Sequence, residues 1–349
     1  MIVSFSYPST ARFGGGVAAL FEYADGLARR GHEVHLIHGP AFPERISSPH
    51  EITWHRFHPQ VVHHVVDRLD DPSLPDGDVM FQHDAPRRLG QPVVLVQGYK
   101  LLSASLERPS FRAPCPKVCV AGWLTEVGRA WGSPPEQLWS VPPGIDVDTF
   151  CLRTPLGERP IDVAMLYTDH PVKGGADGLE ALAEVRRTRP DLRVRLFGLL
   201  PAGPLPPWAT FVEGLDRPGL ATEVYGRARV FVQPSWREGF GLTAVEAMAC
   251  GAALVSTDNG GSRDYARHDA TALVVPPRSP AELAAAIGHL LDHEDERLRL
   301  AAAGAELAAT FTWDRAAERI EAHLLDYLAD PEALQHPPAD APMFLEEPW

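Results

Sequence analysis

The chain has 349 residues, which is too long for one typical hydrophobic core and predicts two domains. Its apolar content of 45% is typical of a globular protein, and no apolar run approaches the length of a membrane-spanning helix. The formal net charge of -14 offers no attraction to nucleic acid or to an anionic membrane surface, so we expect neither as a partner.

The first residues and the cysteines favour a cytoplasmic location. The apolar stretch at the start of the chain has no basic segment before it, so we expect no secretory signal. The four cysteines are scattered, which indicates reduced thiols. Cys115 and Cys119 lack a second pair at ligand spacing, and the four histidines within residues 55–64 also lack such spacing. The sequence therefore predicts no metal site.

The first half of the chain predicts alternating strands and helices. A strand at residues 2–5 leads through the loop Gly14-Gly15-Gly16 into a helix that continues to Arg30, and a strand follows at residues 34–37. Further strands are expected at residues 61–66, 79–82, 93–97 and 118–121. Residues 141–150 contain two prolines and a glycine, so we expect them to connect the two domains.

The second half repeats this alternation. Strands are expected at residues 162–166, 193–198, 210–212, 228–233, 253–256 and 272–275. Helices are expected at residues 176–189, 218–228, 280–292, 295–310 and 313–328. Strands that alternate with helices in both halves predict an α/β fold with two Rossmann-like domains facing each other across a cleft. Ligands of such sheets bind beyond the carboxyl ends of the strands.

The segment at residues 234–251, PSWREGFGLTAVEAMACG, contains two glutamates on either side of a glycine turn. The apolar residues after Gly241 follow helical spacing, and the start of a helix offers unpaired N–H groups to a diphosphate. Gly239 and Gly241 lack the Cβ atoms that would keep a phosphate away. Glu238 precedes the turn and Glu246 follows it, so both carboxylates can accept hydrogen bonds from hydroxyl groups in one cleft. An ordinary strand-loop-helix unit is the alternative, but the full string is more specific than a lone glycine motif.

This segment resembles the Glu-(x)7-Glu signature of the retaining family-4 glycosyltransferases, which have the GT-B fold. The resemblance implies that Glu238 contacts the donor sugar and that Glu246 contacts the ribose. The intervening backbone would hold the phosphates through Gly239, Phe240, Gly241, Leu242 and Thr243.

The same resemblance implies the division of the chain. Residues 1–145 would form the acceptor-side domain, and residues 146–312 would form the domain that binds the nucleotide sugar. Residues 313–349 would form a helix that crosses back onto the first domain, followed by an acidic, proline-containing tail. We expect this tail to lie on the surface or to be partly disordered.

Lys173 lies between a strand and a helix, where an ammonium group could neutralise charge on a leaving diphosphate. Its Lys-Gly context resembles the phosphate-binding lysine of the family. The family normally has an arginine five or six residues earlier, where this chain has Tyr167 and Thr168. The candidates for the second phosphate cation are Arg12 and Arg237, with Arg263 as a weaker one.

Two further candidates lie in the first half of the chain. The Gly15-Gly16 loop resembles the loop that covers the donor phosphate and contacts the acceptor, although a plain tight turn is the alternative. Gln97 stands where many family members have a histidine, and together with Tyr99 it resembles the rhamnosyltransferase-like branch. His83 could serve instead, but a lone histidine at a strand end is more often structural. We rank Gln97 above His83 as a contact of the donor sugar, and neither as a nucleophile.

The resemblance implies a cytoplasmic bacterial hexosyltransferase. It would transfer a sugar from a nucleoside diphosphate sugar to a hydroxyl or amine of a soluble natural-product or saccharide acceptor. No metal ion or other cofactor is expected. Membrane docking is not expected either, because the first domain gives little sign of a basic helix. The alternatives are a GT-B epimerase or phosphorylase and a non-catalytic nucleotide-sugar-binding subunit. The sequence leaves open whether the nucleotide is UDP, dTDP or GDP, and it does not identify the acceptor or the oligomeric state.

Overall fold

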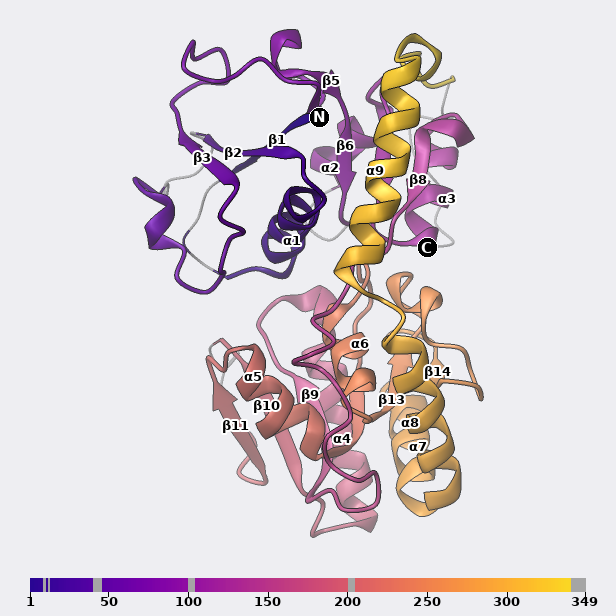
Figure 1. Ribbon diagram of the computed structural model, residues 1–349. Coiled ribbons are helices and arrows are strands. Elements are labelled where there is room, and N and C mark those ends of the chain that lie inside the picture. Colours follow the sequence, from indigo (N-terminus) through magenta and orange to yellow (C-terminus); the bar gives the residue numbers. More distant parts are fainter. Residues whose placement is uncertain (9–10, 12, 40–45, 100–103, 200–204, 340–349) are drawn as a thin grey trace. The chain divides into compact units, whose positions relative to one another are not determined.

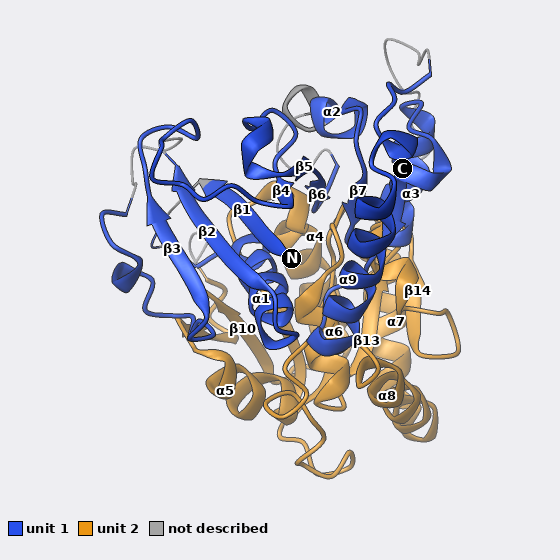
Figure 2. Ribbon diagram, turned by 45° about the horizontal axis from the view of Figure 1, so that its top comes forward, with its two compact units in different colours: residues 1–144, 313–348 blue, residues 145–312, 349 orange. Residues whose placement is uncertain are grey.

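The computed structural model describes residues 1–8, 11, 13–39, 46–99, 104–199 and 205–339. The chain divides into two compact units (Figures 1 and 2). Unit 1 contains Met1–Gly144 and Trp313–Pro348, and unit 2 contains Ile145–Thr312. Within the described ranges, no helix is both long enough and apolar enough to cross a membrane.

Unit 1 contains two parallel sheets, with strand orders β3-β2-β1-β4-β5 and β6-β7-β8. The strands of the first sheet are β1 (Ile2–Pro8), β2 (Glu33–Gly39), β3 (Val61–Val65), β4 (Val79–Phe81) and β5 (Gln91–Pro92). The strands of the second are β6 (Val94–Val96), β7 (Lys117–Cys119) and β8 (Leu138–Ser140). The helices are α1 (Gly15–Arg29), α2 (Ala104–Arg112), α3 (Gly122–Ala130) and α9 (Trp313–Ala329). Val3 and Phe5 of β1 are fully buried, as expected for a strand with neighbours on both sides.

Helix α9 packs against α1 within unit 1. A Cβ atom on Gly26 would lie only 2.7 Å from the Cβ of Ala317, so the absence of a side chain at Gly26 permits this close approach. The ring of Tyr23 meets Trp313 edge-on at 5.3 Å, and its hydroxyl donates to the carbonyl of Val141 at 2.8 Å. Residues from both ends of the chain therefore build the core of unit 1.

The described part of the tail lies on the surface of unit 1. The amide of Ala339 donates to the carbonyl of Gly132 at 2.9 Å. The side chain of Gln137 donates to the carbonyls of Leu334 and His336, at 3.1 and 2.9 Å. The rest of the predicted tail, residues 340–349, lies outside the described residues.

Unit 2 contains one parallel sheet with the order β11-β10-β9-β12-β13-β14. The strands are β9 (Ile161–Leu166), β10 (Val194–Gly198), β11 (Ala209–Glu213), β12 (Ala228–Gln233), β13 (Ala253–Thr257) and β14 (Ala272–Val275). The helices are α4 (Gly175–Thr188), α5 (Arg217–Gly219), α6 (Leu242–Ala249), α7 (Pro280–Asp292) and α8 (Glu294–Ala308). Alternate strand residues such as Val163, Met165, Val230 and Val232 point to one face, where they pack with apolar residues of α4, α7 and α8. The predicted α/β fold with parallel sheets is confirmed.

Several element predictions need correction. The helix expected at residues 218–228 is instead the short α5, a π-helical turn at Leu220–Val224 and a 3-10 turn at Tyr225–Arg227. The elements β5, β8, α2 and α3 were not predicted from the sequence. The strands β5 and β8 are only two and three residues long, and α2 contains Pro109, which weakens a helical pattern. Short 3-10 turns also occur at Pro49–Glu51, Arg87–Leu89, Pro135–Gln137, Pro171–Lys173, Gly261–Asp264 and Glu332–Leu334.

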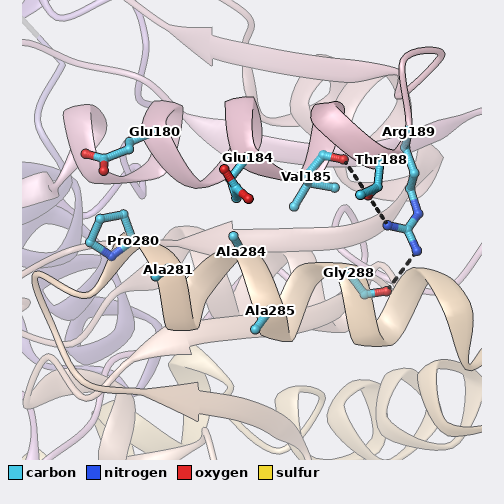
Figure 3. Close-up of a pocket in the computed structure, with 10 residues that line it drawn as sticks. All are labelled: Glu180, Glu184, Val185, Thr188, Arg189, Pro280, Ala281, Ala284, Ala285 and Gly288. Atoms are coloured by element: carbon cyan, nitrogen blue, oxygen red, sulfur yellow. Dashed lines mark hydrogen bonds between the residues drawn. The ribbon is translucent and has the colours of Figure 1, made fainter.

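Helices α4 and α7 lie side by side and line a groove on unit 2 (Figure 3). At one end of the groove, the guanidinium of Arg189 donates to the hydroxyl of Thr188 at 3.3 Å and to the carbonyl of Gly288 at 3.4 Å. None of the site residues predicted from the sequence lines this groove.

Candidate functional site

The strand order of unit 2 indicates where a ligand would bind. The order reverses between β9 and β12, and ligands of such sheets bind at the carboxyl ends of the strands on either side of that reversal. The chain leaving β9 passes through Lys173 into α4, and the chain leaving β12 passes through Glu238 into α6. The two segments of unit 2 that the sequence analysis selected therefore begin at these two strands.

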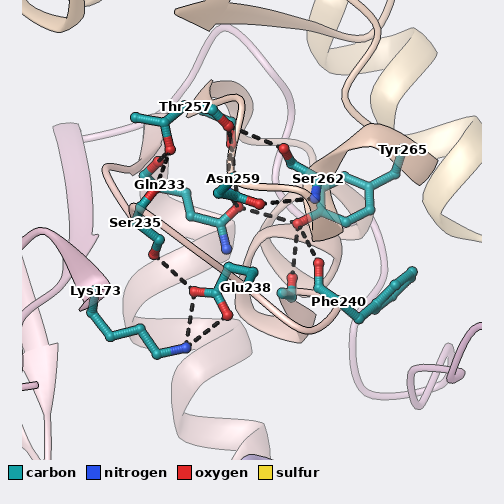
Figure 4. A network of polar contacts seen from close by, with 11 residues as sticks. Lys173, Gln233, Ser235, Glu238, Phe240, Thr257, Asn259, Ser262 and Tyr265 are labelled. Carbon is teal, nitrogen blue, oxygen red and sulfur yellow. Dashed lines mark hydrogen bonds and ion pairs between the residues drawn. The ribbon is translucent and has the colours of Figure 1, made fainter. Parts of the chain in front are cut away.

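Lys173 and Glu238 form an ion pair (Figure 4). The Nζ atom of Lys173 lies 2.7 Å from Oε2 and 2.9 Å from Oε1 of Glu238, and the hydroxyl of Ser235 donates to Oε1 at 2.8 Å. The side chain of Glu238 is only 7% exposed, whereas that of Lys173 is 31% exposed. The carboxylate is therefore neutralised from within the protein, while part of the lysine side chain remains exposed.

The loops that carry this pair are packed on each other. Gly174 has a left-handed backbone, and a Cβ atom there would collide with the carbonyl of Pro234. The amide of Trp236 donates to the carbonyl of Val172 at 2.7 Å, and its indole N–H donates to the carboxylate of Asp177 at 2.7 Å. These contacts fix Lys173 and Glu238 relative to each other.

Helix α6 begins after Gly241, as the sequence predicts. Gly241 is the N-cap residue and has a left-handed backbone with φ of 100° and ψ of 54°. No side chain caps this helix, so its first N–H groups are directed away from the helix without an intrahelical partner. The ring of Phe240 packs on Tyr265 and Phe311, at 5.3 and 5.4 Å between ring centroids. The turn therefore places backbone donors directly after Glu238 in the chain.

Glu246 lies in the second turn of α6 and is partly buried. The hydroxyl of the fully buried Tyr225 donates to its Oε2 atom at 3.2 Å. Burial raises the pKa of the Glu246 carboxyl to about 7, and the positive charge of Arg217 opposes this shift. The site therefore favours the neutral form of this carboxyl more than water does.

The candidates in unit 1 are only partly brought together. The side chain of Gln97 donates to the carbonyl of Gly16 at 2.7 Å, so Gln97 contacts the glycine loop directly. Gly15 is exposed at the start of α1, and His83 is exposed just after β4. Arg12 lies outside the described residues.

The remaining candidates are placed as follows. Arg237 is partly buried beside Glu238 in the chain, and Arg263 forms an ion pair with Asp258 at 2.6 Å. Two of the histidines considered for a metal, His63 and His64, instead contact His38 and His35 across β2 and β3. In the part of the chain that the structure describes, no three His, Cys, Asp or Glu side chains are grouped so that they could hold a metal ion.

Sequence reasoning did not identify Gln233, Ser235, Tyr225 or Tyr265 as parts of the site. Ser235 and Tyr265 are buried and contact Glu238 and the carbonyl of Phe240 respectively. Of these residues, Gln233 was the easiest to detect from the sequence, because it is a polar residue at the end of an apolar run in a buried strand.

The known proteins that this chain is similar to include glycosyltransferases. Residues 153–307, which lie within unit 2, match the family model "Glycosyl transferases group 1". The chain is 30% identical over 237 residues to a D-inositol 3-phosphate glycosyltransferase of Thermobispora bispora, which covers 58% of this chain and 54% of that protein. A second protein of this name, from Thermomonospora curvata, is 28% identical over 291 residues, with 74% and 63% covered. The chain thus spans 54% and 63% of the length of these two curated relatives.

A solved structure of Anabaena HepE in complex with UDP and glucose superimposes with a TM-score of 0.72 at 17% identity, covering 93% of this chain and all of that chain. The sucrose-phosphate synthase of Thermosynechococcus elongatus gives a TM-score of 0.71 at 18% identity, with 94% and 99% covered. At these identities the comparison establishes the fold, which is the GT-B fold.

Proposed function

We propose that this chain is a retaining glycosyltransferase that transfers a sugar from a nucleoside diphosphate sugar to an acceptor hydroxyl or amine. The observation that carries the proposal is the ion pair of Lys173 with Glu238, which precedes α6 in the chain, beyond the strands where the sheet order of unit 2 reverses. The match of residues 153–307 to a glycosyltransferase family model and the names of the relatives support it.

The proposed donor site uses each of these groups for a different part of the donor. The N–H groups around Gly241 and Leu242 bind the diphosphate, because a helix start attracts anions. Glu238 accepts hydrogen bonds from hydroxyls of the sugar, and Glu246 accepts them from the ribose. An ammonium group has three N–H donors, so Lys173 can hold both oxygens of Glu238 and still donate to a phosphate oxygen. In unit 1, Gln97 and the Gly15-Gly16 loop are proposed as further donor contacts, with His83 ranked below them.

The proposed reaction proceeds by front-face attack. The bond between the anomeric carbon and the phosphate oxygen breaks, and the acceptor oxygen or nitrogen bonds to the same face of the sugar. The proton of the acceptor passes to the departing phosphate oxygen. Lys173 and the N–H groups of the turn stabilise the charge that develops there, so the step needs no metal ion. Glu238 is held by Lys173 and Ser235, which fits a binding carboxylate better than a nucleophile.

The identity of donor and acceptor is a further proposal. A UDP-sugar is the first candidate donor, because HepE was solved with UDP and glucose. A saccharide or a phosphorylated polyol is the first candidate acceptor, because relatives are named D-inositol 3-phosphate glycosyltransferase. The rhamnosyltransferase-like branch, a natural-product acceptor and a cytoplasmic location stay predictions from the sequence.

The test is acceptor-dependent release of nucleotide by the purified chain, with UDP-, dTDP- and GDP-sugars as donors. We expect release only when an acceptor is present, and we expect Glu238→Gln to lower kcat about 100-fold. The matched control is Glu184→Gln, which removes a carboxylate from an exposed ion pair with Arg187 at 2.9 Å and should leave kcat unchanged.

The other functions give different results. A phosphorylase would release sugar phosphate, and an epimerase would change the donor without an acceptor. A nucleotide that binds without any turnover across the three donor classes would indicate a non-catalytic binding subunit. Any of these three results would overturn the proposal.

A further inference from the structure

Gln233 is a buried amide at the end of β12, where the other buried side chains are apolar. Its Oε1 atom lies 3.3 Å from the hydroxyl of Ser256, 3.4 Å from the amide nitrogen of Asn259 and 3.1 Å from the hydroxyl of Tyr265 (Figure 4). Its Nε2 atom makes no hydrogen bond with any described residue. A buried donor without a partner is costly, so a polar side chain at this position needs an explanation.

Nε2 of Gln233 is directed toward the glycine turn. A Cβ atom on Gly241 would lie 2.7 Å from Nε2 and would collide with the hydroxyl of Tyr265. Gly241 therefore rests directly on these two polar side chains. Its left-handed φ of 100° adds a second reason why only glycine fits there.

Tyr265 connects this buried network to the backbone of the turn. Its side chain is fully buried, and its hydroxyl lies 3.0 Å from the carbonyl of Phe240 and 3.2 Å from the carbonyl of Gly241. Burial raises the pKa of the Tyr265 phenol, so the hydroxyl keeps its proton and acts as a donor. The backbone of Tyr265 is itself held, because the hydroxyl of Thr271 donates to its carbonyl at 2.6 Å.

Peptide geometry links these carbonyls to the donors of the turn. In a trans peptide the N–H points in the direction opposite to the C=O of the same plane. When the carbonyls of Phe240 and Gly241 point at Tyr265, the N–H groups of Gly241 and Leu242 must point away from it. The amide of Ala244 also donates to the carbonyl of Gly241, at 3.1 Å. The hydroxyl of Tyr265 has one proton to share between the two carbonyls, and it is the side-chain donor that reaches the carbonyl of Phe240.

We propose that Tyr265, oriented by Gln233, is a positioning residue that aims the N–H groups of Gly241 and Leu242 at the diphosphate of the donor. The inference rests on the proposed function, because it takes this turn to be the phosphate site. Tyr265 itself touches neither donor nor acceptor. Its contribution is to fix two peptide planes before the donor arrives, which lowers the cost of ordering them on binding.

The experiment compares a nucleoside diphosphate with its nucleoside. The dissociation constants of UDP and uridine are measured by calorimetry for the full chain, with dTDP and thymidine, and GDP and guanosine, as parallel pairs. The Tyr265→Phe variant keeps the ring and removes the hydroxyl. We expect it to bind the diphosphate about tenfold more weakly and the nucleoside unchanged.

The matched control is Tyr23→Phe, which removes another fully buried hydroxyl that donates to a backbone carbonyl, in unit 1. It should lower stability in a similar way and leave both dissociation constants unchanged. Equal weakening of diphosphate and nucleoside in Tyr265→Phe, or no weakening of either, would overturn the positioning role.

A second variant keeps the inference testable if Tyr265→Phe does not fold. Gln233→Leu retains the hydroxyl of Tyr265 but removes the group that orients it, and we expect about a threefold loss for the diphosphate alone. An unchanged diphosphate affinity in a folded Gln233→Leu chain would count against the proposal. If the wild-type chain binds none of the three diphosphates, the proposed function fails, and the positioning role fails with it. Diphosphate binding that is insensitive to both variants overturns only the positioning role.

Discussion

The carboxyl of Glu246 is a group of the candidate site whose charge changes near neutral pH. Its pKa is raised by burial to about 7, against a value of 4.5 for an unperturbed glutamate. The titratable and charged groups around it are Tyr225, Arg217, Asp146 and Cys250, and only Arg217 favours the ionised form by its charge. Between pH 4.5 and about pH 7, the Glu246 carboxyl keeps its proton in the folded chain but has lost it in the unfolded chain. The free energy of unfolding therefore falls as the pH rises through this window.

A Glu246→Gln variant removes this titration. As the pH rises from 5 to 8, we expect the free energy of unfolding of the variant to increase relative to that of the wild type, by up to about 3 kcal/mol. Thermal unfolding at a series of pH values measures the difference. Parallel stability curves for the two proteins would show that Glu246 does not titrate in this range.

Variants of the Lys173–Glu238 pair should change the stability of the chain and its affinity for the donor independently. Lys173→Met leaves the buried carboxylate without its cation, and we expect a loss of about 2 kcal/mol in the free energy of unfolding. Adding Glu238→Gln removes that charge and should restore most of the stability. Donor affinity should stay low in the double variant, because the phosphate has lost its cation. Urea unfolding and calorimetric titration with UDP test the two halves of this prediction, and recovered UDP affinity in the double variant would contradict it.

At the scale of elements, the sequence predicted the regular parts of unit 2 well. Buried parallel strands such as β12 and β13 read as short apolar runs, and Gly241 marks the start of α6 because only glycine suits its backbone. The helix expected at residues 218–228 failed, because helical spacing does not reveal the π-helical turn at Leu220–Val224.

The packing of α1 on α9 gives a prediction at this scale. Gly26→Ala should raise helix propensity, but the added Cβ would lie 2.7 Å from that of Ala317, and we expect a net loss of about 1–3 kcal/mol. Gly288→Ala in α7 is the matched control, because its Cβ would meet only the guanidinium of Arg189 at 3.7 Å. It should stabilise the chain by up to about 1 kcal/mol. Chemical denaturation of both variants decides the point; equal effects would argue against a close contact at Gly26.

At the scale of the whole molecule, the phosphate and ribose contacts proposed in unit 2 come from two separate segments, one at Lys173 and one at residues 238–246. Sequence reasoning selected Lys173 and Glu238 separately, but it could not foresee their contact, since they lie 65 residues apart. Tyr265 escaped notice because it stands among polar residues, between Asp264 and Ala266, and belongs to no motif; only its hydroxyl contacts distinguish it.

Hydrogen exchange of the full chain can locate the donor. We expect UDP to slow amide exchange most strongly in peptides that cover residues 233–249, because bound phosphate would protect the N–H groups around Gly241. Peptides from the groove between α4 and α7 serve as an internal control and should be unaffected. Protection centred on that groove would place the nucleotide elsewhere.

The division of the chain also has a consequence for its synthesis on the ribosome. Unit 2 is continuous from Ile145 to Thr312, so all of its strands have emerged before α9 is made. Unit 1 must wait, because Trp313 and Ala317 of α9 complete the packing around Tyr23 and Gly26 of α1. The usual order, in which the N-terminal part folds first, is therefore reversed for the last step. Helix α1 can pack on β2 and β3 early, but the side that contacts α9 stays uncovered until translation of α9 ends.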